Sequence, residues 1–218
     1  MWLRRCTDYA ARARTTLGAV ALLALAACGS PGGTRPAPGA AAGQDGSPQA
    51  AVLPPQGQTL FEQAASAMAA GDRVDAELRF KEFLLQYPDV PAAWVNLAII
   101  HGENGDTDAA MDAVGRALAA APDFAPALNQ LGLLHRKNGN FADAEAAYLK
   151  AVTVSPEYPL AHYNLAVLNE LYLQRLDVAL AHFEQYLAIV GDDEQVDKWI
   201  ADLERRVAAN QRTANVAE

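Results

Sequence analysis

A period of 34 residues constrains the fold of this 218-residue chain more than any other feature. It is marked by three prolines and by three glycines that each precede an Asp or Asn: Pro88, Pro122 and Pro156, and Gly71, Gly105 and Gly139, followed by Asp72, Asp106 and Asn140. Glycine tolerates the left-handed conformation at a helix C-terminus, Asp and Asn are good N-caps, and proline moves the preceding residue out of the α region. The pattern therefore predicts a repeating unit of two helices, with the glycine in the turn between them.

The small and apolar residues of each unit fill the pattern of the tetratricopeptide repeat, a helical repeat of 34 residues. The second unit has Trp94, Leu97, Ala98, His101, Ala110, Val114 and Pro122, and the third has Leu128, Leu131, Gly132, His135, Ala144, Tyr148 and Pro156. The fourth has His162, Leu165, Ala166, Asn169, Ala179 and Phe183 after a one-residue insertion, and the first keeps Ala76, Phe80 and Pro88. Residues 58–191 thus resemble tetratricopeptide repeats. The resemblance implies an all-α, right-handed solenoid of about four helix-turn-helix repeats.

The small residues Ala98, Gly132 and Ala166 are expected to let the two helices of a unit approach closely. The fourth unit departs from the pattern, because residues 172–177 replace the glycine with a longer and more apolar turn. After Gly191, acidic residues suit a helix N-terminus. An apolar stripe then follows on one helix face: Val196, Trp199, Ile200, Leu203 and Val207. We predict a C-terminal capping helix over 192–209 and a frayed tail over 210–218; docking of a partner is the alternative role of this helix.

The N-terminus has the features of a secretory signal peptide over residues 1–27. Arginines precede an apolar run from Leu17 to Ala27, which is too short to cross a bilayer because a spanning helix needs about 20 residues. The run ends in Leu25-Ala26-Ala27-Cys28, which resembles a bacterial lipobox. The resemblance implies that Cys28 is lipidated and becomes the first residue of the mature chain. An ordinary signal peptide or a short membrane anchor is the alternative.

Residues 28–57 are predicted to form a flexible linker, because Pro, Gly, Ala, Gln and Ser dominate and little can be buried. Gly29, rather than Asp, follows the cysteine. By the sorting rule of many Gram-negative lipoproteins, this implies an outer-membrane lipoprotein that faces the periplasm.

No catalytic motif is apparent, so we expect a non-enzymatic protein without a cofactor, a metal site or a small-molecule substrate. His101 and His135 occupy equivalent positions and are expected to be packed, half-buried side chains, since no further Cys or His has a suitable spacing for a shared metal. The formal net charge of −9 argues against a nucleic-acid partner. The membrane is expected to be contacted only through the lipid.

The resemblance to tetratricopeptide repeats implies a concave groove that is lined by the first helix of each unit and binds a peptide or helix of a protein partner. Mapped onto this chain, the lining residues are Phe61, Val95, Ile99, Glu103, Asn129, Leu133, Arg136, Lys137, Tyr163, Val167 and Glu170. Tyr163 and Arg136 are the expected hot spots. The set that would capture a C-terminal carboxylate is incomplete, although Asn96 and Asn164 are present. Alternatively, the linker or the cap of the chain itself fills part of the groove.

These features predict a lipid-anchored periplasmic scaffold or adaptor that binds another envelope protein and helps to assemble or position an envelope complex. The alternatives are a regulatory subunit of a peptidoglycan enzyme, a pilotin-like assembly factor of type IV pili, and an accessory protein of a TonB-type energy-transducing complex. Segments 164–174 and 198–203 resemble the last group most.

Overall fold

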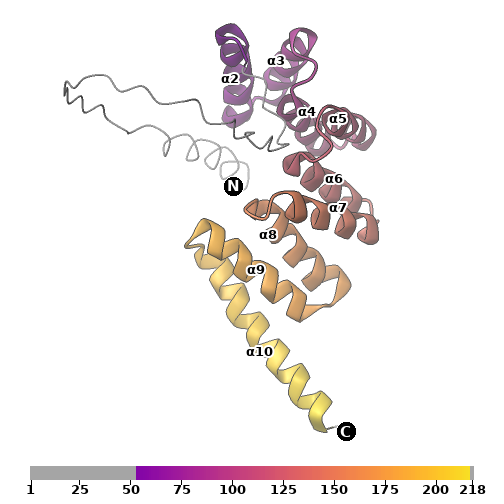
Figure 1. Cartoon of the computed structure of the whole chain (residues 1–218), viewed down its shortest axis with the longest axis vertical. Helices are drawn as coiled ribbons and strands as arrows, with labels where there is room; N and C mark the ends of the chain where they lie inside the picture. Colours follow the sequence, from indigo (N-terminus) through magenta and orange to yellow (C-terminus); the bar gives the residue numbers. More distant parts are fainter. Residues whose placement is uncertain (1–52, 217–218) are drawn as a thin grey trace, which may run out of the picture.

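The computed structural model describes residues 53–216, and every regular element in this part of the chain is a helix (Figure 1). The helices are α2 (Pro55–Ala70), α3 (Arg73–Gln86), α4 (Pro91–Glu103), α5 (Thr107–Ala120), α6 (Ala125–Lys137), α7 (Phe141–Val154), α8 (Pro159–Leu168), η1 (Asn169–Leu173), α9 (Leu176–Val190) and α10 (Glu194–Val216). The pairs α2–α3, α4–α5, α6–α7 and α8–α9 form four hairpins, and each hairpin packs on the next. The expected all-α solenoid of four repeats with a terminal helix is confirmed.

The turns inside the first three hairpins follow from the periodic glycines and acids. Gly71, Gly105 and Gly139 have φ of 83°, 83° and 79°, the left-handed conformation that glycine adopts without a steric penalty. The side chain of Asp72 accepts a hydrogen bond from the Asp75 amide at 3.0 Å, and Asp106 does the same for Ala109. Asn140 is the N-cap residue of α7, as expected, but its side chain makes no cap hydrogen bond. A neutral amide gains less from the helix dipole than a carboxylate does.

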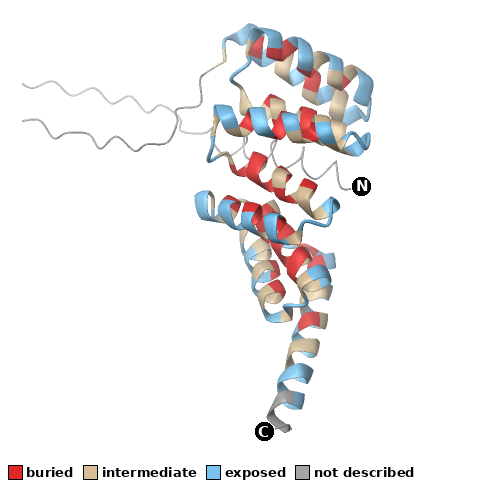
Figure 2. Cartoon of the chain, turned by 90° about the vertical axis from the view of Figure 1, so that its right-hand side faces the viewer, coloured by how far each residue is buried: buried red, intermediate tan, exposed pale blue. Residues whose placement is uncertain are grey.

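Small residues face large ones where the helices of a hairpin meet. A Cβ atom built on Gly132 would lie 2.5 Å from Cε1 of Tyr148, whose ring is fully buried. Ala64, Ala98 and Ala166 are likewise fully buried, in clusters that contain Phe80, Val114 and Phe183. Figure 2 shows buried residues on helix after helix along the stack. The expected close approach of paired helices is confirmed.

The fourth hairpin reverses direction without glycine. α8 continues into a π-helical turn, η1, and the chain then passes through Gln174, which has a φ of 55°. With the one-residue insertion counted, Gln174 occupies the repeat position of Gly139. It is the one non-glycine residue with positive φ among residues 53–216.

The ends of the repeat region differ by a few residues from the expected boundaries. α2 begins at Pro55, so residues 55–57 belong to the first helix, and Gly57 is buried against the Tyr87 ring. α10 begins beside Asp193, whose carboxylate accepts from the Gln195 amide, and it extends to Val216 rather than ending at 209. The proposed signal peptide, Cys28 and the linker up to residue 52 lie outside the described residues. No helix over residues 53–216 is long and apolar enough to span a bilayer.

Candidate partner-binding surface

The first helices of the last three hairpins lie side by side, because α4 packs on α6 and α6 packs on α8. Ile99, Leu133 and Val167 occupy the same repeat position on these helices, so they share one face of the solenoid. The predicted lining residues therefore fall on a common face from α4 to α8. The structure nevertheless gives them different roles.

Two of the predicted lining residues, Val95 and Asn129, are buried, and a third, Phe61, is partly buried against the core. Phe61 packs edge-on against Phe80 and Phe83, with ring centroids 5.7 and 5.5 Å apart. Val95 is only 7% exposed and packs with Ala117 and Ala127, so it is a core residue and not an open floor.

Asn129 is also buried, and its side-chain oxygen accepts a hydrogen bond from Nδ2 of Asn164 at 2.9 Å. This bond joins α6 to α8, so both amides have a structural partner. Ile99 and Leu133 remain half-buried on the face that α4 and α6 form, which we call the α4–α6 face.

Charged residues lie at the C-terminal ends of α4 and α6. Glu103 accepts a 2.7 Å hydrogen bond from Nε of Arg73, and Nζ of Lys137 donates to the Gly102 carbonyl at 3.3 Å. The guanidinium of Arg136 lies 6.0 Å from the ring centroid of Tyr172, within the range of a cation–π contact. Neither Arg136 nor Lys137 forms an ion pair with a carboxylate among residues 53–216, so both positive charges can meet an acidic group of a partner.

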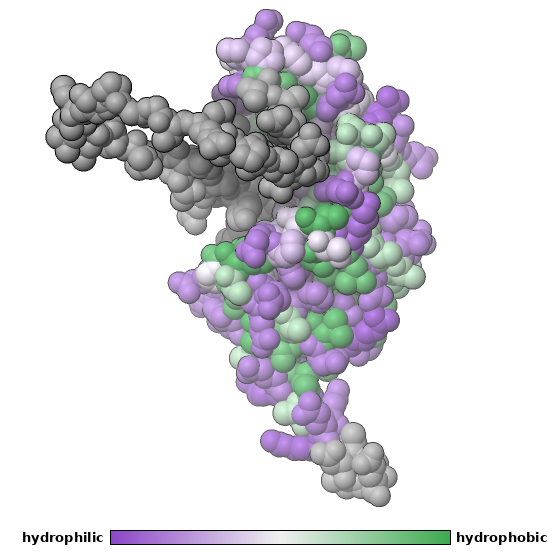
Figure 3. Space-filling model, in the orientation of Figure 1, coloured by the Kyte–Doolittle hydropathy of each residue, from purple (hydrophilic) through white to green (hydrophobic). Residues whose placement is uncertain are grey.

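Tyr163 and Val167 pack beneath the C-terminal helix. The Tyr163 ring lies 5.4 Å from that of Tyr186 on α9 and 6.0 Å from that of Trp199 on α10. Val167 contacts the same cluster, which includes the buried Val196 and Leu203 of α10. Hydrophobic residues are interspersed with hydrophilic ones over α8 and α9 in Figure 3. Tyr163, which the sequence suggested as a hot spot, is thus part of the interface with the capping helix α10.

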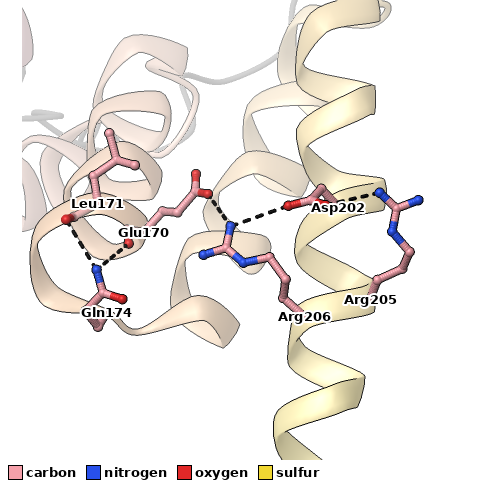
Figure 4. A network of polar contacts seen from close by, with 6 residues as sticks. All are labelled: Glu170, Leu171, Gln174, Asp202, Arg205 and Arg206. Atoms are coloured by element: carbon pink, nitrogen blue, oxygen red, sulfur yellow. Dashed lines mark hydrogen bonds and ion pairs between the residues drawn. The ribbon is translucent and has the colours of Figure 1, made fainter.

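An ion-pair network fixes α10 on the fourth hairpin (Figure 4). Nη1 of Arg206 donates to Glu170 at 2.6 Å and lies 3.5 Å from Asp202. The hydrogen bond with Glu170 raises the pKa of Arg206, and the hydrogen bond from Arg205 lowers the pKa of Asp202. The cap packs on the last hairpin as the first helix of a following repeat would, and two predicted lining residues, Tyr163 and Val167, lie in its interface.

Comparison with family models decides the classification. Residues 67–132 and residues 129–194 each match a model of the tetratricopeptide repeat. The chain belongs to the tetratricopeptide repeat family. No curated protein matches the sequence of this tetratricopeptide repeat protein.

Solved tetratricopeptide repeat structures resemble it in fold. MamA shares 26% identity at a TM-score of 0.51 and is matched over 61% of this chain and 77% of its own. PilF of Pseudomonas aeruginosa shares 21% identity at a TM-score of 0.63, over 70% of this chain and 69% of its own. The first repeat domain of Spaghetti, solved bound to an HSP90 peptide, shares 18% identity at a TM-score of 0.51, over 54% of this chain and 95% of its own.

A histidine pair in the last repeat escaped sequence analysis. Nδ1 of His162 lies 3.1 Å from Nδ1 of His182, and Nε2 of His162 lies 3.0 Å from the Pro156 carbonyl. In the second repeat, the Trp94 indole donates to the Pro88 carbonyl in the equivalent position. His162 therefore donates from Nε2 and accepts at Nδ1 from His182. Burial and the neighbouring His162 lower the pKa of His182.

His101 and His135 are half-buried, as expected. Within residues 53–216, this repeat protein has no group of three or more His, Cys, Asp or Glu residues that could hold a metal ion. Sequence analysis placed Tyr148 in the repeat pattern but did not predict its shifted pKa, which burial raises to about 12 while the charge of Arg136 opposes the shift. Its repeat position, opposite Gly132, was the available signal.

Proposed function

We propose that this tetratricopeptide repeat protein is a non-enzymatic scaffold that is anchored in the outer membrane through lipidated Cys28 and faces the periplasm. Its α4–α6 face binds an amphipathic helix or peptide of another envelope protein. The anchoring is supported by the lipobox-like sequence Leu25-Ala26-Ala27-Cys28 and the preceding basic and apolar segments. The binding role is supported by the packing of the first helices.

The observation that carries the binding proposal is a row of half-buried apolar residues, Ile99, Leu133 and Val167, at one repeat position of α4, α6 and α8. At the α8 end, Tyr163 and Val167 pack against the cluster that contains the apolar stripe of α10, and Glu170 of η1 pairs with Arg206. Ile99 packs partly against the cluster that contains Ala127 of α6, and both Ile99 and Leu133 stay half-buried on the α4–α6 face. This face thus offers partly exposed apolar side chains to which an amphipathic helix can bind.

Charge at the α4–α6 face indicates what the partner carries. Arg136 and Lys137 lie one turn or less beyond Leu133, and an acidic side chain is the natural counterpart of both. The partner segment is therefore apolar at helical spacing, with an Asp or Glu toward the C-terminal end of α6. A related fold in the Spaghetti domain binds a peptide, which shows that such a fold can hold one.

Photocrosslinking in intact cells tests the binding face. A benzophenone amino acid at Leu133 is expected to capture one dominant protein, and Arg136→Glu should reduce the capture at least threefold. The matched control places the same amino acid at Leu149 on α7, which is 43% exposed and lies on the second helix of the same hairpin. Equal capture from both positions, or no band from Leu133, would refute the binding face.

Substitution of the proposed lipidation site tests the anchor separately. Cys28→Ser removes the sulfur that would carry the diacylglyceryl group, so the protein should remain uncleaved or leave the outer-membrane fraction. Cys6→Ser is the control, because residue 6 lies within the expected signal peptide. Equal recovery of the Cys28→Ser protein in the outer membrane would refute lipid anchoring while leaving the binding face untouched.

A further inference from the structure

The outer face of α3 exposes three large aliphatic side chains. Val74, Leu78 and Leu85 are 82%, 64% and 86% exposed, and Lys81 is exposed between the last two. The four positions follow one another at intervals of four, three and four residues. This spacing places apolar residues on a single seam and is the spacing by which one helix packs along another.

Equivalent positions in the other repeats show that the fold does not require this seam. One repeat later, α5 carries Asp108, Asp112 and Ala119, and two repeats later, α7 carries Ala142, Ala146 and Thr153. All six are exposed. At the positions of Val74, Leu78 and Leu85, α5 and α7 thus carry small or acidic residues, whereas the position of Lys81 is taken by Gly115 and by the exposed Leu149. The large aliphatic residues at these positions on α3 therefore suggest a contact with something outside the repeat.

We propose that this seam is a self-association surface, on which α3 of a second copy packs antiparallel. The spacing of the seam is symmetric about a point between Leu78 and Lys81. A two-fold axis at that point places Val74 opposite Leu85 of the second copy and Leu78 opposite the aliphatic part of Lys81. Such an interface uses the same patch on both copies, as two-fold interfaces do.

The charge of α3 is compatible with a second copy as the occupant. α3 carries three cations (Arg73, Arg79 and Lys81) and three anions (Asp75, Glu77 and Glu82), so its net charge is zero in a chain of −9. Two copies of α3 can therefore pack together without a net charge repulsion between the two helices. α3 also lies at the end of the solenoid opposite α10, where a second molecule can approach without meeting the cap (Figure 1).

The expected dimer is weak. A helix of 14 residues is about 21 Å long, and one helix pair buries less area than a standard protein interface. We therefore expect a dissociation constant on the order of 10 to 100 µM, with association visible at high protein concentration.

Sedimentation equilibrium of the full, unlipidated chain tests self-association. The variant Val74→Asp, Leu78→Asp, Leu85→Ala gives α3 the residues that α5 carries at the same positions, and it should weaken the dimer at least tenfold. Because the three side chains are exposed, its melting temperature should stay within a few degrees of the parent chain. Any association caused by the N-terminal apolar segment is common to both proteins. A parent chain that is monomeric up to 500 µM, or a variant that dimerises equally, overturns the proposal.

Cysteine pairing tests the orientation. In a Cys6→Ser, Cys28→Ser background, a mixture of the Val74→Cys chain and a size-tagged Leu85→Cys chain should form the mixed disulfide in preference to either homodimer. Asp108→Cys and Ala119→Cys on α5 are the matched controls and should not cross-link. If the two homodimers exceed the mixed product, the helices pack in parallel and the proposal is overturned. The proposal is also overturned if the chain stays monomeric and binds lipid vesicles through the three aliphatic residues.

Discussion

Gly132→Ala is the sharpest test of how the hairpins pack. At this point α6 passes so close to α7 that an added Cβ would lie 2.5 Å from Cε1 and 2.6 Å from Cδ1 of Tyr148. Carbon atoms in contact normally lie 3.5 to 4.0 Å apart. The Tyr148 ring is fully buried, so it cannot move outward without disturbing the neighbouring hairpin.

Two opposing effects set the magnitude. In the interior of a helix, Ala is about 1 kcal/mol more favourable than Gly. Overpacking a core costs about 1 to 3 kcal/mol, and the contact with a rigid ring places this substitution at the upper end. The net loss is therefore about 2 kcal/mol. For a domain of this size, it corresponds to a decrease of roughly 4 to 8 °C in melting temperature.

Gly115→Ala provides the matched control. Gly115 lies inside α5, and a Cβ added there meets nothing within 4 Å. Only the helix-propensity effect remains, so this variant should gain up to about 1 kcal/mol. Thermal and denaturant unfolding of both variants, followed by circular dichroism, should show changes of opposite sign. If Gly132→Ala is as stable as Gly115→Ala, the close approach of α6 and α7 is wrong.

A compensating substitution extends the test. The double variant Gly132→Ala, Tyr148→Val reproduces the pairing that Ala98 and Val114 form in the second repeat, where both are buried in one cluster. Tyr148→Val alone should lose about 2 to 4 kcal/mol, because it leaves a cavity. In a double-mutant cycle, the pair should be at least about 1 kcal/mol more stable than the sum of the single changes. Strict additivity would show that the two positions do not touch.

Three further substitutions test the last repeat. Burial and, to a smaller extent, His162 lower the pKa of His182, so below about pH 6.5 the unfolded chain binds more protons than the folded chain. The free energy of unfolding should therefore decrease as the pH is lowered, by at most about 1.4 kcal/mol per pH unit. His182→Gln should remove this decrease when the free energy of unfolding is measured from pH 8 to pH 5. An unchanged pH dependence in the variant would refute the role of His182. Leu203→Ala should lose about 2 to 5 kcal/mol and release hydrogen-exchange protection in α10 first; simultaneous release in α6 would refute local packing. Glu170→Gln should cost at most about 1 kcal/mol by thermal unfolding, because Arg206 is partly exposed; a larger loss would show a stronger ion pair.

The repeat period predicts most of the fold because its markers act locally. Proline fixes its own φ, and glycine permits the left-handed conformation that other residues avoid, so Gly71, Gly105 and Gly139 mark three turns without reference to the rest of the chain. The conformation of Gln174 could not be predicted in this way. This residue adopts positive φ because the π-helical turn after α8 requires it, and no local rule assigns that conformation to glutamine.

The binding face was only partly predictable. A periodic pattern shows which side of a helix is apolar, but it does not show what covers that side. Tyr163 therefore looked like a free hot spot and in fact packs against Trp199, 36 residues later. The apolar stripe of α10 was visible in the sequence, whereas its target on α8 depends on how the last hairpin packs.

Differences between equivalent positions carry the information that the shared pattern lacks. Each repeat buries its faces against its neighbours only, so every second helix could carry the same outward residues. At three of these outward positions α5 and α7 carry small or acidic residues, whereas α3 carries Val74, Leu78 and Leu85. On the first helices, Val167 packs against the cluster that includes α10, whereas Ile99 packs against the cluster that includes Ala127 of α6. A repeat position that departs from its equivalents without a structural reason is where a contact with another molecule is to be sought.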